Sequence, residues 1–173
     1  MTSHNISTSI ESEAEFFKNV FAEQDALTTE KKNTFRTETI SERRERLARE
    51  LWHRMQGVVA YGPFKGLHLD WDVSWSQAAI SSMLLGCYEL EIMDAIHAPE
   101  FADRTHFVDI GAADGYYAVG TLRNGRFQSA DCFELTDTGR DTIHRNARRN
   151  GVSERLRVYA SADRGLAQYG GSL

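Results

Sequence analysis

The sequence of 173 residues has few of the features that mark secreted, fibrous or membrane proteins. It contains only two cysteines, Cys87 and Cys132, and neither lies in a CxxC pattern or beside a histidine cluster. This predicts neither a disulfide framework nor a metal site. Two prolines and 13 glycines exclude a collagen-like or low-complexity chain. The longest apolar stretch, about residues 78–88, is interrupted by serines and Gly86 and is too short to cross a bilayer.

The charge and the first residues narrow the class of protein further. Residues 1–15 contain no basic segment followed by an apolar core, so no signal peptide is expected and we predict a cytoplasmic location. The net charge of -5 argues against a general nucleic-acid binder. A hydrophobic content of 41% with 26% charged residues is typical of a soluble globular protein, and the length fits one domain.

Helical periodicity predominates in the first hundred residues. Residues 1–38 are predicted to form a flexible and helical extension, with an amphipathic helix from Glu11 followed by a polar linker. Residues 39–100 are predicted to form a helical region. Its firmest helix runs over residues 41–60, after the capping-box pair Thr39 and Glu42.

The rest of this helical region contains turns and shorter elements. The stretch Gly62-Pro63-Phe64-Lys65-Gly66 predicts a turn, and residues 67–69 a short strand. A helix around residues 80–85, capped by Ser74 or Ser76, should break at Gly86. A further helical pattern ends near Pro99.

The pattern changes in residues 101–173, which alternate between strand and helix. Strands are predicted over residues 106–110, 129–134 and 155–160. Helices are predicted over residues 116–122, from Asp137 to Asn150, and from Asp163 to Tyr169. Alternation with short turns is typical of a parallel sheet, so the fold class is α/β. We expect a partial, Rossmann-like sheet of about three strands.

The most informative stretch is Phe107-Val108-Asp109-Ile110-Gly111-Ala112-Ala113-Asp114-Gly115-Tyr116-Tyr117. An apolar run ends in small residues and then becomes a helix, which predicts a buried strand, a tight turn and a helix start. Gly111 can take a positive φ, and Gly115 can let the backbone approach a ligand. An ordinary strand-to-helix turn remains the alternative.

Glu134 strengthens the binding hypothesis because it ends the next predicted strand, at the same edge of the sheet as the turn. It lies about twenty residues past the turn, the spacing at which an acid accepts hydrogen bonds from ribose hydroxyls. A nicotinamide site prefers G-x-G-x-x-G, but its middle and last positions are here Ala113 and Tyr116. A nucleoside ligand without a pyrophosphate fits better. Asp109 can order the turn or attract a cationic amino group.

The turn D-x-G-x-A-x-G resembles the first motif of class I S-adenosylmethionine (SAM)-dependent methyltransferases, with Ala113 in place of a third glycine. With the upstream stretches Gly62–Gly66 and Met83-Leu84-Leu85-Gly86-Cys87-Tyr88-Glu89, the chain from about residue 60 to 160 resembles FkbM-type methyltransferases. The resemblance implies a Rossmann-like fold that uses SAM to methylate a hydroxyl of a small molecule or sugar.

The resemblance also implies roles for particular residues. The turn would line the methionine end of SAM, Glu134 would hold the ribose, and Asp163 would meet the adenine. Lys65, Tyr88 and Glu89 could cover the cofactor. The cofactor-binding candidates are Asp109, Gly111, Ala113, Asp114, Gly115, Tyr116, Glu134 and Asp163.

Further expectations concern what completes the site. The basic residues between Arg140 and Arg149 are predicted to form a solvated outer face. Only 58 residues follow Gly115, whereas the class I fold has about seven strands, so we expect a partial sequence and name no catalytic residue. An uncovered edge of the first strand could permit self-association. The rival hypotheses are a nicotinamide-linked oxidoreductase fragment and a non-catalytic helical interaction protein.

Overall fold

The computed structural model describes residues 39–72 and 77–162. Several predicted features lie outside these residues: the helix from Glu11, the linker after it, the capping serines and the helix from Asp163. The contacts within the chain divide it after Arg43. The sheet, the core and the site described below all belong to the unit that begins at Arg44.

The centre of the fold is a parallel sheet of three strands in the order β1-β2-β3. The strands are β1 (His106–Ile110), β2 (Ser129–Phe133) and β3 (Leu156–Tyr159). β1 is connected to β2 through α6 (Tyr116–Arg123), and β2 to β3 through α7 (Asp137–Arg149) and the short 3-10 helix η3 (Ser153–Arg155). The predicted α/β, Rossmann-like arrangement of about three strands is confirmed, including the limits of the first strand.

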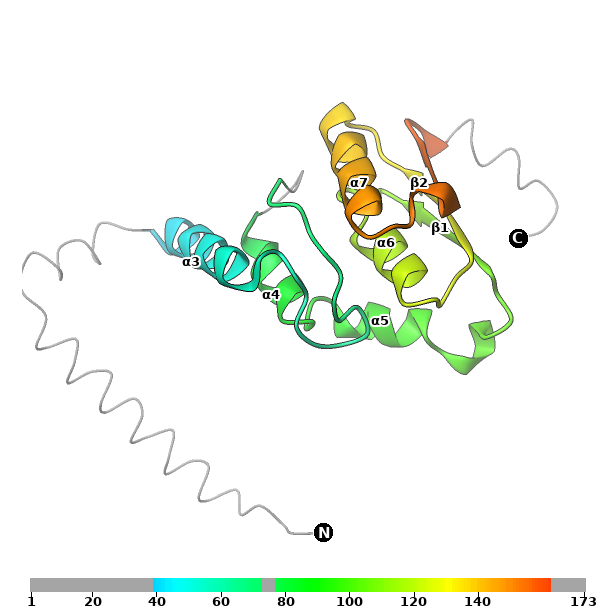
Figure 1. The fold of residues 1–173 in the computed structure, drawn as a ribbon, viewed down its shortest axis with the longest axis horizontal. Coiled ribbons are helices and arrows are strands. Elements are labelled where there is room, and N and C mark those ends of the chain that lie inside the picture. Colours follow the sequence, from blue (N-terminus) through cyan, green and yellow to red (C-terminus); the bar gives the residue numbers. More distant parts are fainter. Residues whose placement is uncertain (1–38, 73–76, 163–173) are drawn as a thin grey trace, which may run out of the picture. The chain divides into compact units, whose positions relative to one another are not determined.

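Helices α6 and α7 pack on one face of the sheet (Figure 1). Ala130 and Cys132 of β2 are buried beneath them, together with Leu122 of α6 and Ile143 of α7. Alternation along the strand places these small side chains toward the helices, because successive strand residues point to opposite faces. The ends of β1 and β2 are thereby held next to the starts of both helices.

Helix α3 (Ile40–Met55) begins where the sequence predicts and ends earlier. The capping box forms: Thr39 N donates to Glu42 Oε2 at 2.8 Å, and Glu42 N donates to Thr39 Oγ1 at 3.2 Å. The predicted extension to residue 60 is wrong, because Gln56 and Gly57 have φ values of 53° and 69°. A Cβ at Gly57 would lie 2.7 Å from the carbonyl oxygen of Leu69, so the chain turns back at this glycine.

The segment between α3 and the sheet contains short elements. They are η1 (Gln77–Ala79), α4 (Ile80–Leu84), α5 (Leu90–Ile96) and η2 (Pro99–Phe101). The predicted strand over residues 67–69 is reduced to a single bridge between Val58 and His68. The predicted break at Gly86 is confirmed: its φ is 69°, and a Cβ would lie 2.1 Å from the carbonyl oxygen of Tyr61.

In the part of the chain that the structure describes, β1 pairs with β2 and with no other strand. Self-association through its other edge therefore stays a prediction. No described helix combines the length and the apolar character needed to cross a membrane.

Candidate functional site

The bend between β1 and α6 is built from three residues in the left-handed conformation. Gly111 has a φ of 79°, Ala113 of 52° and Gly115 of 77°. The positive φ predicted for Gly111 is confirmed, and a Cβ added to it would meet no atom within 4 Å. The backbone is therefore open to a ligand at Gly111. Ala113 adopts a conformation that residues with a Cβ rarely take.

Gly115 has a packing role that the sequence did not predict, and its predicted role toward a ligand stays a prediction. A Cβ at this position would lie 3.3 Å from side-chain carbons of Ile143 and Val119, so glycine lets α6 and α7 approach each other. Gly115 also does not line the cavity described below, whereas Gly111 does. The open approach to a ligand is at the first glycine of the bend.

Glu134 follows β2 and turns its side chain toward the bend. Its Oε2 accepts a hydrogen bond from Ala113 N at 3.0 Å, and its Oε1 accepts from Thr136 N at 2.8 Å and Thr136 Oγ1 at 2.7 Å. Burial opposes the charge of this carboxylate, but these bonds and the nearby Arg140 hold its pKa below the usual range. Glu134 is therefore an ionised acceptor, and within the described residues its Oε2 accepts one hydrogen bond and can accept another.

A cavity of about 570 Å³ lies between the bend, Glu134 and the segment before α5. Its volume is in the range of sites for cofactors and drug-sized ligands. Its described lining residues are Met83, Tyr88, Glu89, Asp109, Ile110, Gly111, Ala112, Ala113, Asp114, Tyr116, Tyr117, Glu134 and Thr136. Four of these are carboxylic acids, and none is lysine or arginine. The cavity therefore favours a ligand with positive charge.

Asp109 and Asp114 are the most unusual of these acids. Among the described residues, Oδ2 of each is buried and has no hydrogen-bond partner. Burial raises the pKa of both to about 6; backbone N–H groups of Ala118 (for Asp109) and Tyr116 (for Asp114) oppose the rise. Asp114 is only 2% exposed, and its Oδ1 accepts from Tyr116 N at 3.0 Å. A buried carboxylate oxygen without a partner is costly unless a ligand satisfies it.

Aromatic side chains form a further part of the cavity wall. The rings of Tyr88 and Tyr116 lie 5.6 Å apart, and the Tyr117 hydroxyl donates to Glu89 Oε2. Burial, together with the nearby charge of Glu89, raises the pKa of Tyr88 to about 12. Burial also raises the pKa values of Tyr116 and Tyr117. These phenols therefore stay protonated at neutral pH.

A second cavity of about 510 Å³ adjoins the first beyond Glu134. The two share Ile110, Gly111, Glu134 and Thr136, and the second is otherwise lined by Phe133, Leu135 and residues 160–162. Leu135 is 79% exposed, so an apolar side chain next to Glu134 in the sequence is accessible to a ligand. Together the cavities provide an acidic end, a central acceptor and an apolar end.

The structure brings together most of the predicted site residues. Six of them line the first cavity: Asp109, Gly111, Ala113, Asp114, Tyr116 and Glu134. Tyr88 and Glu89 line it as well, whereas Lys65 is exposed and does not. Asp163 lies outside the described residues.

Two features of α7 differ from the sequence-based expectations. The helix is capped by Thr136, one residue before the predicted Asp137, and Thr136 Oγ1 accepts from Gly139 N at 3.1 Å. The prediction of a solvated basic face is wrong for Arg140 and Arg145, which are half-buried. Arg140 Nη1 donates to the carbonyl oxygens of Glu134 and Leu135, each at 2.7 Å.

Gly139 is a site residue that the sequence analysis missed. A Cβ added to it would lie 2.6 Å from Glu134 Cγ and 2.9 Å from the carbonyl oxygen of Ala113. Glycine at this position lets the start of α7 pack directly against the acid and the bend. A glycine in the first turn of an amphipathic helix carries no pattern that would reveal such a contact.

Comparisons with known proteins give likenesses of fold only. An O-methyltransferase family protein from Burkholderia thailandensis aligns at 14% identity over 75% of this chain and 40% of its own, with a TM-score of 0.41. The C-terminal domain of precorrin-6Y C5,15-methyltransferase from Rhodobacter capsulatus aligns at 26% identity over 44% and 40%, with a TM-score of 0.37.

Geranyl diphosphate C-methyltransferase from Streptomyces coelicolor, crystallised with S-adenosyl-L-homocysteine (SAH), aligns at 20% identity over 63% of this chain and 41% of its own, with a TM-score of 0.37. The chain thus spans less than half the length of these proteins. No protein-family model matches it, and no curated protein does. The function is therefore argued from the geometry of the site.

Proposed function

We propose that this chain binds SAM and is the cofactor-binding part of a class I methyltransferase of FkbM type. The observation that carries the proposal is the charge of the first cavity: four carboxylic acids line it, two with buried, unpartnered oxygens, and no lysine or arginine is among its described lining residues. SAM carries an ammonium and a sulfonium against a single carboxylate, so its net charge is positive and complementary to these acids. A dinucleotide carries an anionic pyrophosphate, which the same acids would repel.

Different residues of the site would bind different groups of SAM. Asp109 and Asp114 would accept hydrogen bonds from the ammonium group, which satisfies their unpartnered oxygens. Glu134 Oε2 would accept from one ribose hydroxyl; a second hydroxyl requires Thr136 Oγ1 to release Oε1. Leu135 and the second cavity would take the adenine.

When bound, SAM supplies an electrophilic methyl group on a positively charged sulfur. The contribution of this chain to the transfer is to hold and orient that group and to exclude water from it. The tyrosines at the cavity are not bases at neutral pH, because burial and Glu89 keep them protonated. The acceptor we propose is a hydroxyl of a small molecule or sugar, as in the family that the sequence resembles.

The proposal is tested by calorimetric titration of the purified chain with SAH, which cannot react. The wild type should bind SAH. Glu134→Gln should bind at least about tenfold more weakly, because a charge-assisted hydrogen bond contributes roughly 1.5–3 kcal/mol. Glu154→Gln is the matched control, since Glu154 is exposed and lies outside the cavity. Equal affinities for Glu134→Gln and the wild type would remove Glu134 from the site.

The same titration with NADH distinguishes the proposal from the oxidoreductase and interaction-protein hypotheses. The proposal expects no heat from NADH at concentrations where SAH saturates the chain. NADH binding without SAH binding would support the oxidoreductase hypothesis. A chain that binds neither would support the helical interaction protein.

A further inference from the structure

Asn146, in the middle of α7, connects the bend to a distant part of the chain. It is only 2% exposed, and both ends of its amide are used. Its Nδ2 donates to the carbonyl oxygen of Asp114 at 2.9 Å, and its Oδ1 accepts from Asp70 N at 2.7 Å. One partner is an acceptor and the other a donor, so only one orientation of the amide satisfies both.

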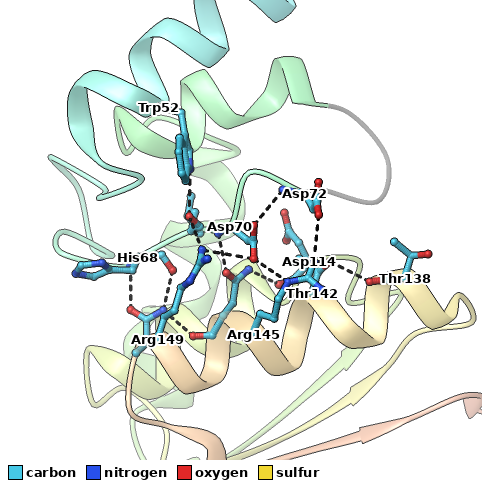
Figure 2. A network of polar contacts seen from close by, with 12 residues as sticks. Trp52, His68, Asp70, Asp72, Asp114, Thr138, Thr142, Arg145 and Arg149 are labelled. Atoms are coloured by element: carbon cyan, nitrogen blue, oxygen red, sulfur yellow. Dashed lines mark hydrogen bonds and ion pairs between the residues drawn. The ribbon is translucent and has the colours of Figure 1, made fainter.

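The Asp70 end of this connection is fixed by an ionic cluster on the same helix (Figure 2). Asp70 Oδ2 lies 2.7 Å from Arg145 Nε and 3.4 Å from Arg149 Nη1. Burial alone would raise the pKa of Asp70, but the bond from Arg145, the Asp72 N–H and the charge of Arg149 hold it below the usual range. The segment that contains Asp70 is therefore held to α7 by ion pairs between the Asp70 carboxylate and two arginines of the helix.

The Asp114 end lies in the candidate site. The carbonyl that Asn146 binds belongs to the residue whose carboxylate Oδ2 is buried, unpartnered and part of the cavity wall. The bend combines three left-handed residues, one of them alanine, and such a backbone persists only when its surroundings fix it. Within the described residues, Asn146 supplies the side-chain hydrogen bond that holds the Asp114 carbonyl.

We propose that Asn146 is a positioning residue that sets the bend, and with it the Asp114 carboxylate, for binding the cationic end of SAM. The proposal rests on the function proposed above. Asn146 does not line the cavity, so its effect is transmitted through the Asp114 backbone. Asp70 and its two arginines hold Asn146 in the required orientation.

Asn150, the C-cap residue of α7, is a matched comparison one turn beyond Asn146. Its Oδ1 accepts from His68 N at 2.9 Å, and its Nδ2 donates to the His68 carbonyl at 2.8 Å. It therefore joins α7 to the same segment as Asn146 does, through the same kinds of bond. Among the described residues, its side-chain hydrogen bonds do not reach the bend, so Asn150→Ala removes the structural link and leaves Asp114 held.

The experiment compares Asn146→Ala, Asn146→Asp and Asn150→Ala with the wild type. The readouts are SAH affinity by calorimetry, unfolding in urea, and hydrogen exchange of the Gly115 and Tyr116 amides, which donate to Ala112 O and Asp114 Oδ1 within the bend. Asn146→Asp keeps an acceptor for Asp70 N and, at about pH 8, turns a charged oxygen toward the Asp114 carbonyl.

Both Asn146 variants should bind SAH at least about tenfold more weakly than Asn150→Ala and should exchange the two amides faster, even where the loss of stability is equal. The inference is overturned if the wild type binds SAH and if Asn146→Ala and Asn150→Ala change affinity and amide exchange equally. If the wild type does not bind SAH, the proposed function fails. Exchange then still decides whether Asn146 holds the bend.

Discussion

At the residue scale, Ala113 is one of three described residues other than glycine that have a positive φ. Its φ of 52° is left-handed, which costs a residue with a Cβ roughly 1–2 kcal/mol relative to the right-handed conformation. Its N–H nevertheless donates to Glu134, so this geometry connects the bend to the acid. Glycine would adopt the same backbone without the steric cost.

We therefore expect Ala113→Gly to stabilise the chain by about 0.5–1 kcal/mol, after the greater flexibility of glycine in the unfolded state is counted. Urea denaturation measures this change. Ala112→Gly is the control: Ala112 is a buried neighbour that is not among the residues with positive φ, so its replacement should destabilise. A loss of stability in Ala113→Gly would mean that the bend does not strain Ala113.

How far the site was predictable also differs from residue to residue. Glu134 could be predicted because its distance from the glycine turn is fixed by the length of one strand–helix–strand unit. The sequence also located Asp109 and Asp114. It does not show that their Oδ2 atoms are buried and lack a partner among the described residues, because this depends on packing from other elements. The contacts of Asn146 and the packing role of Gly115 likewise depend on contacts between α6, α7 and distant segments.

At the element scale, the first turn of α7 packs against the end of β2. Gly139 makes this possible, because any Cβ there would overlap Glu134 Cγ and approach the Ala113 carbonyl. Contacts below 3.0 Å cannot be tolerated in a packed interior, so one of the elements must shift. The movable partner is the Glu134 side chain.

Gly139→Ala should therefore weaken SAH binding at least about tenfold, although alanine is intrinsically the better helix former by about 1 kcal/mol. Thr138→Ala is the control, because it changes the exposed neighbouring position of the same helix turn. Calorimetry gives the affinities, and circular dichroism checks that both variants keep their helix content. Unchanged affinity in Gly139→Ala would show that Glu134 can move without loss.

Element boundaries were predictable where the signal is local. The Thr39 and Glu42 capping box and the strand His106–Ile110 depend on neighbouring residues, and both appear as predicted. The end of α3 depends on the close approach of Leu69 to Gly57, a contact between residues far apart in sequence. Arg145 was expected in solvent for the same reason: its partner Asp70 comes from another part of the chain.

At the scale of the whole molecule, two groups of acids respond to pH in opposite ways. The pKa of Asp70 is lowered in the folded state, so its contribution to stability is present above the unfolded value and is lost as the pH falls through the folded pKa. The pKa values of Asp109 and Asp114 are raised to about 6, so between about pH 4 and 6 the folded state holds more protons than the unfolded state. Their contribution to stability therefore falls as the pH rises through this window.

A ligand with an ammonium group should reverse that cost at the site. Deprotonated Asp109 and Asp114 bind an ammonium group and protonated ones do not, so SAH affinity should rise about tenfold between about pH 5 and pH 7.5. Adenosine is the matched control ligand: it has the ribose and adenine but no ammonium group, and its affinity should stay nearly constant over this range. Titration calorimetry of both ligands at several pH values measures the difference. Parallel pH dependence for SAH and adenosine would place the ammonium group away from the two aspartates, because only the amino-acid end of SAH distinguishes these ligands in charge.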